Sequence, residues 1–129
     1  MLRARGRDDV VVRSGGIAPY ARDTSLVSLD TRMLLRDDDI ELSADATSCD
    51  LKAHREHIAQ ADLIVVMTAE QKRMLARFDE AAGKDVVTLR ELAGETGDIE
   101  DPAGRGHDFY GACRDEIRRC LERGIDRLT

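Results

Sequence analysis

Asp101 stands directly before Pro102, in the stretch DIEDPAG that runs from residue 98 to residue 104. Proline fixes its own backbone φ and pushes the residue before it toward an extended conformation, which aims the Asp101 carboxylate out of its loop. A carboxylate presented in this way can give up and take back a proton during catalysis. Asp-Pro is also a common way to begin a turn, so the dipeptide alone leaves both interpretations open.

The other side chains with reactive groups are three cysteines, Cys49, Cys113 and Cys120. No Cys-x-x-Cys pair and no cluster of histidine and cysteine indicates a metal, and we expect no cofactor. The start, MLRARGRDDV, has no apolar stretch after its charges and so does not resemble a signal peptide. An odd number of cysteines in such a chain favours reduced thiols in the cytoplasm.

Hydrophobic periodicity predicts the elements that must position these groups. Short β-branched or apolar runs predict strands, and apolar residues at helical spacing predict helices. In chain order we expect a strand at Val10–Arg13, a helix over Leu26–Leu35, a helix marked by Leu51, Ile58 and Ala61, a strand at Ala61–Thr68, a helix from Thr68 that ends at Gly83, a strand at Asp85–Leu89, a loop to His107 and a helix over Asp108–Gly124. Thr68 with Gln71 forms a capping-box pattern at the start of its helix.

Strands that alternate with helices predict a parallel sheet covered by helices, within one domain that spans residues 1–129. Apolar residues make up 42% of the chain, enough for a core, and the net charge of −6 is spread over mixed signs. Nucleic-acid binding needs a one-sided basic surface, so we expect none. No apolar run approaches the length of a membrane span, so we expect no membrane partner.

Four segments resemble, in order and spacing, the low-molecular-weight protein tyrosine phosphatases, and especially their bacterial branch, which includes protein arginine phosphatases. The segments are VRSGGI (12–17), ADLIVVMT (61–68), DVVTL (85–89), and DIEDPAG (98–104) followed by the last amphipathic helix. The resemblance implies a three-layer α/β/α fold with a short parallel sheet, of the phosphotyrosine protein phosphatase I type. It also implies hydrolysis of phosphomonoesters, on a phosphorylated protein or a small phosphate ester, through a cysteinyl-phosphate.

Asp101 is, by this resemblance, the general acid, with Pro102 as its support. Ser14 matches a serine that supports the phosphate loop of the family by hydrogen bonding. In the family, Ala usually stands where this chain has Gly15. A serine that merely ends a strand is the alternative interpretation of Ser14.

The resemblance also implies a phosphate loop, Cys-x5-Arg followed by Ser or Thr, between the first strand and the first helix. Its backbone N–H groups hold the phosphate, its cysteine attacks phosphorus as a thiolate, and its arginine grips two phosphate oxygens. We expect the chain to lack this first strand and loop, to be truncated at its N-terminus, and therefore to be inactive as written. Cys49–Arg55 and Cys113–Arg119 match Cys-x5-Arg literally, but both lie in helical patterns without glycine, and we expect neither to be the nucleophile.

Several alternatives stay open. The chain is either a phosphatase with a misplaced start or a catalytically dead binding or regulatory module, and an arsenate reductase is a weaker third reading. Ala103 stands where the family usually has an aromatic residue after Asp-Pro, which leaves phosphoarginine and phosphotyrosine both open. Without the first strand, we expect Val10–Arg13 to pair with Leu63–Val66, or a second chain to fill the gap, or the sheet to stay open and self-associate.

Overall fold

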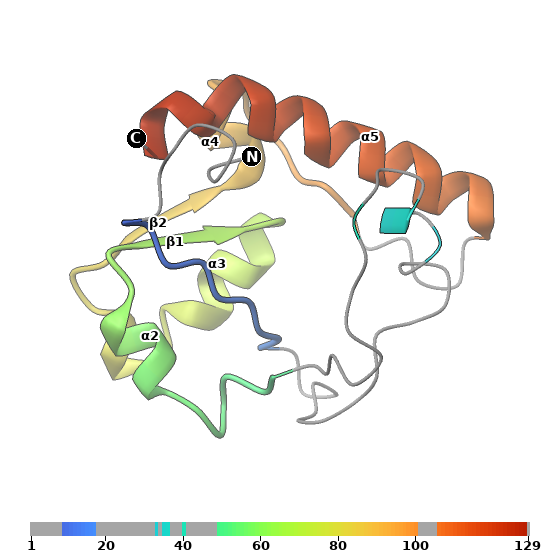
Figure 1. Ribbon diagram of the computed structural model, residues 1–129. Coiled ribbons are helices and arrows are strands. Elements are labelled where there is room, and N and C mark those ends of the chain that lie inside the picture. Colours follow the sequence, from blue (N-terminus) through green and yellow to red (C-terminus); the bar gives the residue numbers. More distant parts are fainter. Residues whose placement is uncertain are drawn as a thin grey trace.

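The structure, a computed structural model, describes residues 9–17, 33, 35–36, 40, 49–100 and 106–128. The helices and strands in these ranges are α2 (Glu56–Gln60), β1 (Leu63–Val66), α3 (Ala69–Leu75), β2 (Asp85–Thr88), α4 (Leu89–Leu92) and α5 (His107–Gly124), with short 3-10 turns at Asp79–Ala81 and Ile125–Leu128. Their order is shown in Figure 1. Of the predicted helix over Leu26–Leu35, only Met33 and Leu35 belong to these ranges, and both are helical.

β1 and β2 form a parallel pair in which Leu63 stands opposite Asp85 and Val66 opposite Thr88. The chain passes from one strand to the other through α3. Parallel strands that are buried on both faces have continuous apolar sequences. Both strands could be predicted from the sequence for this reason. Each is shorter than predicted: Thr68 and Leu89 each belong to a helix start instead.

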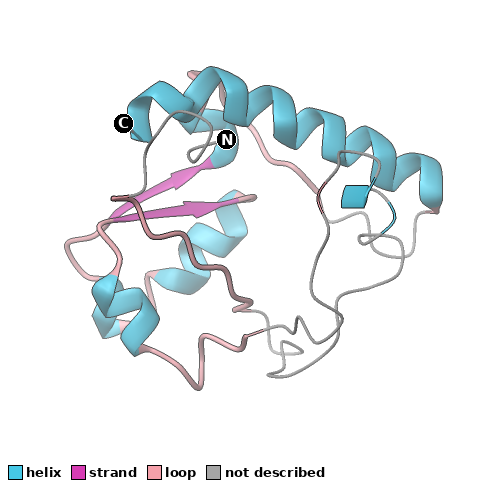
Figure 2. Cartoon of the chain, viewed as in Figure 1, coloured by secondary structure: helices cyan, strands magenta, loops and turns pink. Residues whose placement is uncertain are grey.

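Two apolar clusters cover the two faces of this sheet, which gives three layers, α/β/α. Leu63 and Val65 of β1 pack with the buried cluster formed by α4 and α5. Ile64 packs with the cluster formed around α2 and α3, to which Val66 itself belongs. Figure 2 shows helices on both sides of the two strands. The fold class implied by the resemblance is therefore confirmed.

The strand predicted at Val10–Arg13 was wrong, since these residues have no strand structure. Val11 and Val12 are 78% and 74% exposed. A β-branched run forms a strand only where a neighbour offers a ladder and a surface to pack on, and among the described residues the only strand paired with β1 is β2. Val10–Arg13 therefore did not move over to Leu63–Val66, and the other two expected outcomes stay predictions.

Gly15 and Gly16 lie where residues 14–17 come into close contact with residues 49–51. Gly16 donates to the carbonyl of Cys49 at 2.9 Å, and Leu51 donates back to the carbonyl of Gly16 at 3.0 Å. A Cβ atom added to Gly15 would lie 2.6 Å from Cγ of Leu51. Gly15 thus leaves the room that residues 14–17 need to approach residues 49–51.

The starts of the two helices after the strands are fixed by threonine caps. Thr68 accepts a hydrogen bond from the amide of Gln71, but the Gln71 side chain accepts from Met67 and not from Thr68, so only half of the predicted capping box forms. α3 ends at Leu75, well before Gly83. A complete box, between Thr88 and Glu91, begins α4 in a stretch that we had predicted as loop.

Candidate active site

The segment from Glu95 to Glu100, called here the 95–100 segment, leads directly to Asp101 in the sequence and is fastened to the end of β1. The amide of Ile99 donates to the carbonyl of Met67, the residue after β1, at 2.9 Å. The carboxylate of Asp98 accepts from the amide of Ala69, the first residue of α3, at 2.9 Å. Ligands of open parallel sheets bind beyond the carboxyl ends of the strands, and the 95–100 segment arrives at this edge.

The same segment is also held from the side of α4 and α5. Ile99 is 5% exposed and packs in the buried cluster with Leu89, Leu92 and Cys120. Arg90 donates from Nε to the carbonyl of Asp98 at 3.1 Å. These contacts leave the backbone at residues 98 and 99 little freedom.

Gly97 lets the chain turn into this position. Its φ of 112° lies in a region that only glycine enters readily, and a Cβ there would lie 3.4 Å from Cδ of Arg90. A larger residue would be strained by its backbone and would press on the arginine that holds Asp98. The turn that presents the motif DIEDPAG therefore begins at Gly97, one residue before the motif itself.

Glu95 fixes the other end of the 95–100 segment to α5 through arginines. Arg119 donates two hydrogen bonds to its carboxylate, at 2.6 Å and 2.9 Å. Arg123 contributes a third at 2.8 Å, and Arg90 lies 3.4 Å away. The Arg119 hydrogen bonds and the surrounding positive charge lower the pKa of Glu95 to about 2. The network therefore joins α4, the 95–100 segment and α5.

The predicted site residues are not brought together in the part of the chain that the structure describes. Asp101 and Pro102 lie outside the described residues, and Glu100 is the last described residue before them. Ser14 lies in the 9–17 segment with an exposed side chain. The roles of Asp101, Pro102 and Ser14 therefore stay predictions.

Cys49–Arg55 is not a phosphate loop, although its structure differs from the helix that we expected. Residues 49–55 contain a single β-bridge residue, Asp50, followed by a turn that leads into α2. The amides that could have held an anion already donate to protein oxygens: Leu51 to Gly16, Lys52 to the Asp50 carboxylate, Ala53 to Asp50 and His54 to Leu51. Its arginine lies over the Phe78 ring, 5.0 Å from the centroid, and pairs with Glu80.

Cys113–Arg119 is not a phosphate loop either, because the whole span lies inside α5, as predicted. The thiol of Cys113 lies 3.8 Å from the carbonyl of Glu100. Cys120 is fully buried, and desolvation raises the pKa of its thiol. A nucleophilic cysteine needs a lowered pKa and access to solvent, which Cys120 does not have.

Comparison with protein families identifies the class of protein. Residues 1–129 match the family described as low molecular weight phosphotyrosine protein phosphatase. The chain belongs to this family.

Its relatives include enzymes named as arginine phosphatases. The chain is 35% identical over 129 residues to a protein-arginine-phosphatase of Geobacillus stearothermophilus, covering 99% of this chain and 83% of the relative. The solved structure of the YwlE arginine phosphatase from that organism superposes with a TM-score of 0.83 at 34% identity, over 98% of this chain and 79% of that one. A low molecular weight protein tyrosine phosphatase from T. tengcongensis gives a TM-score of 0.82 at 27% identity, over 98% and 82%.

The sequence alone missed the residues that hold the 95–100 segment. Glu95, Arg90 and Arg119 are ordinary charged residues in a strongly charged chain, and nothing in their spacing marks them as partners. The usable signal was the Thr88–Glu91 capping box, which would have revealed α4 and placed Arg90 on it.

The Glu95 network predicts a specific dependence of stability on pH. The folded-state pKa of about 2 is depressed from the usual value of about 4.3, so its stabilisation is present above that usual value and is lost as the pH falls toward 2. Glu95→Gln should therefore lower the melting temperature by a few degrees at pH 7, and the difference from wild type should shrink below about pH 4 and be mostly lost near pH 2. Thermal melts between pH 2 and pH 7 test this.

Glu122→Gln, at an exposed position of α5, is the matched control and should leave the wild-type profile unchanged. A difference between wild type and Glu95→Gln that stays constant across this pH range would show that the ion pairs do not stabilise the fold.

Proposed function

We propose that this chain is a protein phosphatase that acts through a cysteinyl-phosphate and uses Asp101 as its general acid. The observation that carries the proposal is the attachment of the 95–100 segment to the carboxyl end of β1 through Ile99 and Asp98. This attachment supports delivery of the next residue, Asp101, to the edge where a phosphorylated ligand would bind. A carboxylic acid there would protonate the leaving group and then activate water for the second step.

The substrate that we propose is phosphoarginine in a protein, in preference to phosphotyrosine. Ala103 follows Asp101-Pro102 in the place where the family usually carries an aromatic residue against the substrate ring. The relative of Geobacillus stearothermophilus is named a protein-arginine-phosphatase, and the structure that superposes with a TM-score of 0.83 is that of an arginine phosphatase. A smaller residue at position 103 suits a flexible guanidino substrate better than it suits a ring.

We also propose that the 129 residues do not contain the nucleophile. A cysteine-to-serine mutant of the YwlE arginine phosphatase carries a phosphorylated active-site serine. None of the three cysteines here has the surroundings for that role: Cys49 precedes a turn whose amides are occupied, and the other two lie within α5. The same observation favours the second candidate function, a binding or regulatory module that keeps the acid loop as scaffold.

The chain of 129 residues should accordingly show negligible hydrolysis of p-nitrophenyl phosphate and of a phosphoarginine peptide. Loss of a covalent nucleophile removes most of the rate enhancement of such enzymes. Release of p-nitrophenol and of phosphate measures the two reactions. Robust turnover that disappears in Cys49→Ser or Cys113→Ser would assign the nucleophile to that cysteine and contradict the proposal.

A chain extended at its N-terminus by a strand and a Cys-x5-Arg-Ser loop should be active, and its activity should depend on Asp101. In that chain, Asp101→Asn should slow the release of a poor leaving group by roughly 10²–10⁴-fold, the usual worth of a general acid. The loss should shrink for good leaving groups, because they need less protonation. Asp115→Asn, on α5, is the control; an equal loss for all leaving groups would give Asp101 a different role.

Self-association of the chain belongs to the same proposal. The 9–17 segment exposes Val11 and Val12, and Ile17 packs in the cluster that contains Val66.

No described helix is long and apolar enough to cross a membrane. None of the three cysteines is joined in a disulfide, which suits the cytoplasm, the location that we propose.

The self-association predicts a concentration-dependent sedimentation coefficient for the 129 residues. Val11→Asp combined with Val12→Asp should reduce it toward the monomer value, because buried carboxylates without partners oppose association. Ile40→Asp adds a charge at another exposed apolar residue and should have no such effect. A wild-type chain that sediments as a monomer at every concentration would overturn this part of the proposal.

A further inference from the structure

His54, Glu56 and His57 gather three ligand atoms at the start of α2, away from the 95–100 segment. Oε1 of Glu56 lies 3.3 Å from Nδ1 of His54 and 3.8 Å from Nε2 of His57. The three ligand atoms lie within 4.8 Å of one another. The two imidazole rings are nearly perpendicular, with an angle of 83° between them, so their nitrogens approach the carboxylate from different directions.

These separations are close to those in a tetrahedral metal site. Zinc bonds of about 2.0–2.2 Å to nitrogen and oxygen place neighbouring ligands roughly 3.3 Å apart. One pair in the cluster already has this spacing, the second pair needs a shift of less than an ångström, and the ligand nitrogens of the two histidines lie no more than 4.8 Å apart. Two imidazoles with one carboxylate suit zinc, copper or nickel, whereas magnesium and calcium prefer sites made only of oxygen.

A second cluster with suitable atom types, Glu95, Glu116 and Cys120, does not compete as a metal site. Its carboxylates are already bound by guanidinium groups: Arg119 binds both, Arg123 binds Glu95, and Arg90 lies beside the two. Those three positive charges would repel a divalent cation. Its thiol is fully buried under the same network.

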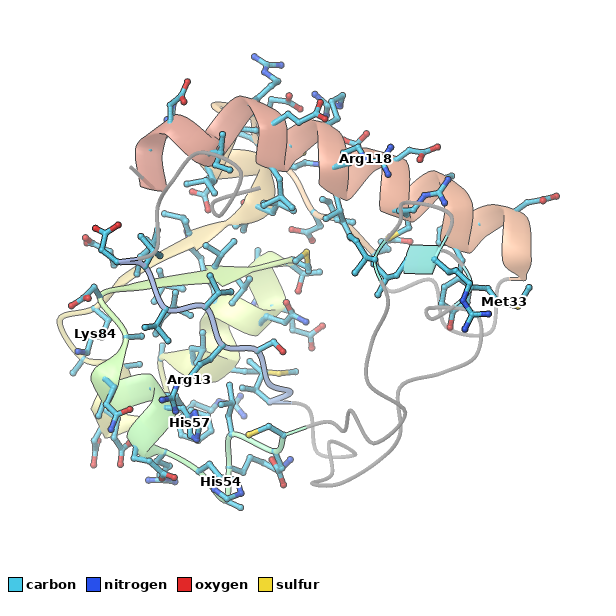
Figure 3. The ribbon with its side chains drawn as sticks, in the orientation of Figure 1. Arg13, Met33, His54, His57, Lys84 and Arg118 are labelled. Carbon is cyan, nitrogen blue, oxygen red and sulfur yellow. The ribbon has the colours of Figure 1, made fainter. Side chains whose placement is uncertain are left out.

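Arg13 is a group that a metal would have to displace from His57. Its Nη1 lies 3.2 Å from Nδ1 of His57, and Figure 3 shows the two side chains next to each other. Guanidinium can only donate, so Nδ1 of His57 accepts and Nε2 carries the ring proton. A metal at Nε2 requires the proton on Nδ1 instead, where Arg13 can no longer donate.

We propose that His54, Glu56 and His57 form a binding site for Zn²⁺ or a similar transition-metal cation, with Arg13 as its competitor for His57. The site goes beyond the proposed phosphatase function and does not depend on it. When the metal binds through Nε2, Arg13 leaves His57, and the 9–17 segment loses one of its contacts with α2. The occupied site therefore releases a constraint on the segment that carries Ser14.

Isothermal titration of the 129-residue chain with ZnCl₂, in a buffer that does not bind zinc, tests the proposal. We expect one site per chain that is absent for MgCl₂. His57→Ala and Glu56→Gln should each weaken zinc binding by about tenfold or more, since each removes one of three protein ligands. His107→Ala removes the remaining histidine of the chain and should bind as wild type does. Circular dichroism of each variant confirms that it is folded.

Arg13→Gln separates this site from adventitious binding to a surface histidine. If Arg13 competes for His57, its removal should tighten zinc binding by roughly 3- to 10-fold, because the cost of displacing a charge-assisted hydrogen bond is gone. The proposal is overturned if no zinc binds, if the His57→Ala chain binds as wild type does, if Arg13→Gln weakens binding, or if binding disappears in Cys49→Ser and persists in Glu56→Gln.

Discussion

The hydrogen bond from the amide of Ile99 to the carbonyl of Met67 connects the sheet of this protein to its candidate catalytic loop. It joins two segments that lie far apart in the sequence and ties the 95–100 segment to the end of β1. The side chain of Ile99 then inserts into the core beneath α4 and α5. Because one residue provides both the backbone and the core attachment, the position of the chain just before Asp101 depends on the packing of the whole α4–α5 side.

Charged groups attach the 95–100 segment at further points, in addition to Ile99. Arg90 holds the carbonyl of Asp98, and Asp98 itself caps the first turn of α3. Glu95 accepts hydrogen bonds from arginines of α4 and α5, so the 95–100 segment is fixed at both ends. Surface ion pairs are individually weak, but a carboxylate shared by several guanidinium groups orders more than one element at a time. We infer that the network contributes to the position of the 95–100 segment at least as much as it contributes to the stability of the fold.

The sequence predicted the parts of the fold that follow from local pattern. The two-sided apolar runs at residues 63–66 and 85–88 identified both strands, and helical spacing identified α5 almost to the residue. Val10–Arg13 failed for a physical reason: its β-branched residues favour a strand, but a strand also needs a partner, and local sequence says nothing about partners. The short α4 was hidden for a related reason, because a single turn of helix carries no periodicity.

The candidate site was predictable only as far as its motif. Asp101-Pro102 could be picked out from the resemblance, and the structure describes the chain up to the residue before it. The contacts of Arg90, Glu95 and Asp98 could not be picked out, because charged side chains find their partners through the tertiary fold. The same limit applied to His54, Glu56 and His57, whose shared geometry depends on how the turn after Cys49 enters α2.

Hydrogen exchange of the Ile99 amide in the 129-residue chain tests the central claim most directly. If the 95–100 segment is anchored to β1 as described, this amide should exchange about as slowly as the most protected amides of β1 and β2, since both open only when the core opens. The exposed amide of Thr96 provides the internal reference for fast exchange. Exchange of Ile99 as fast as that of Thr96 would mean that the segment before Asp101 is not held by the sheet, and would contradict the account.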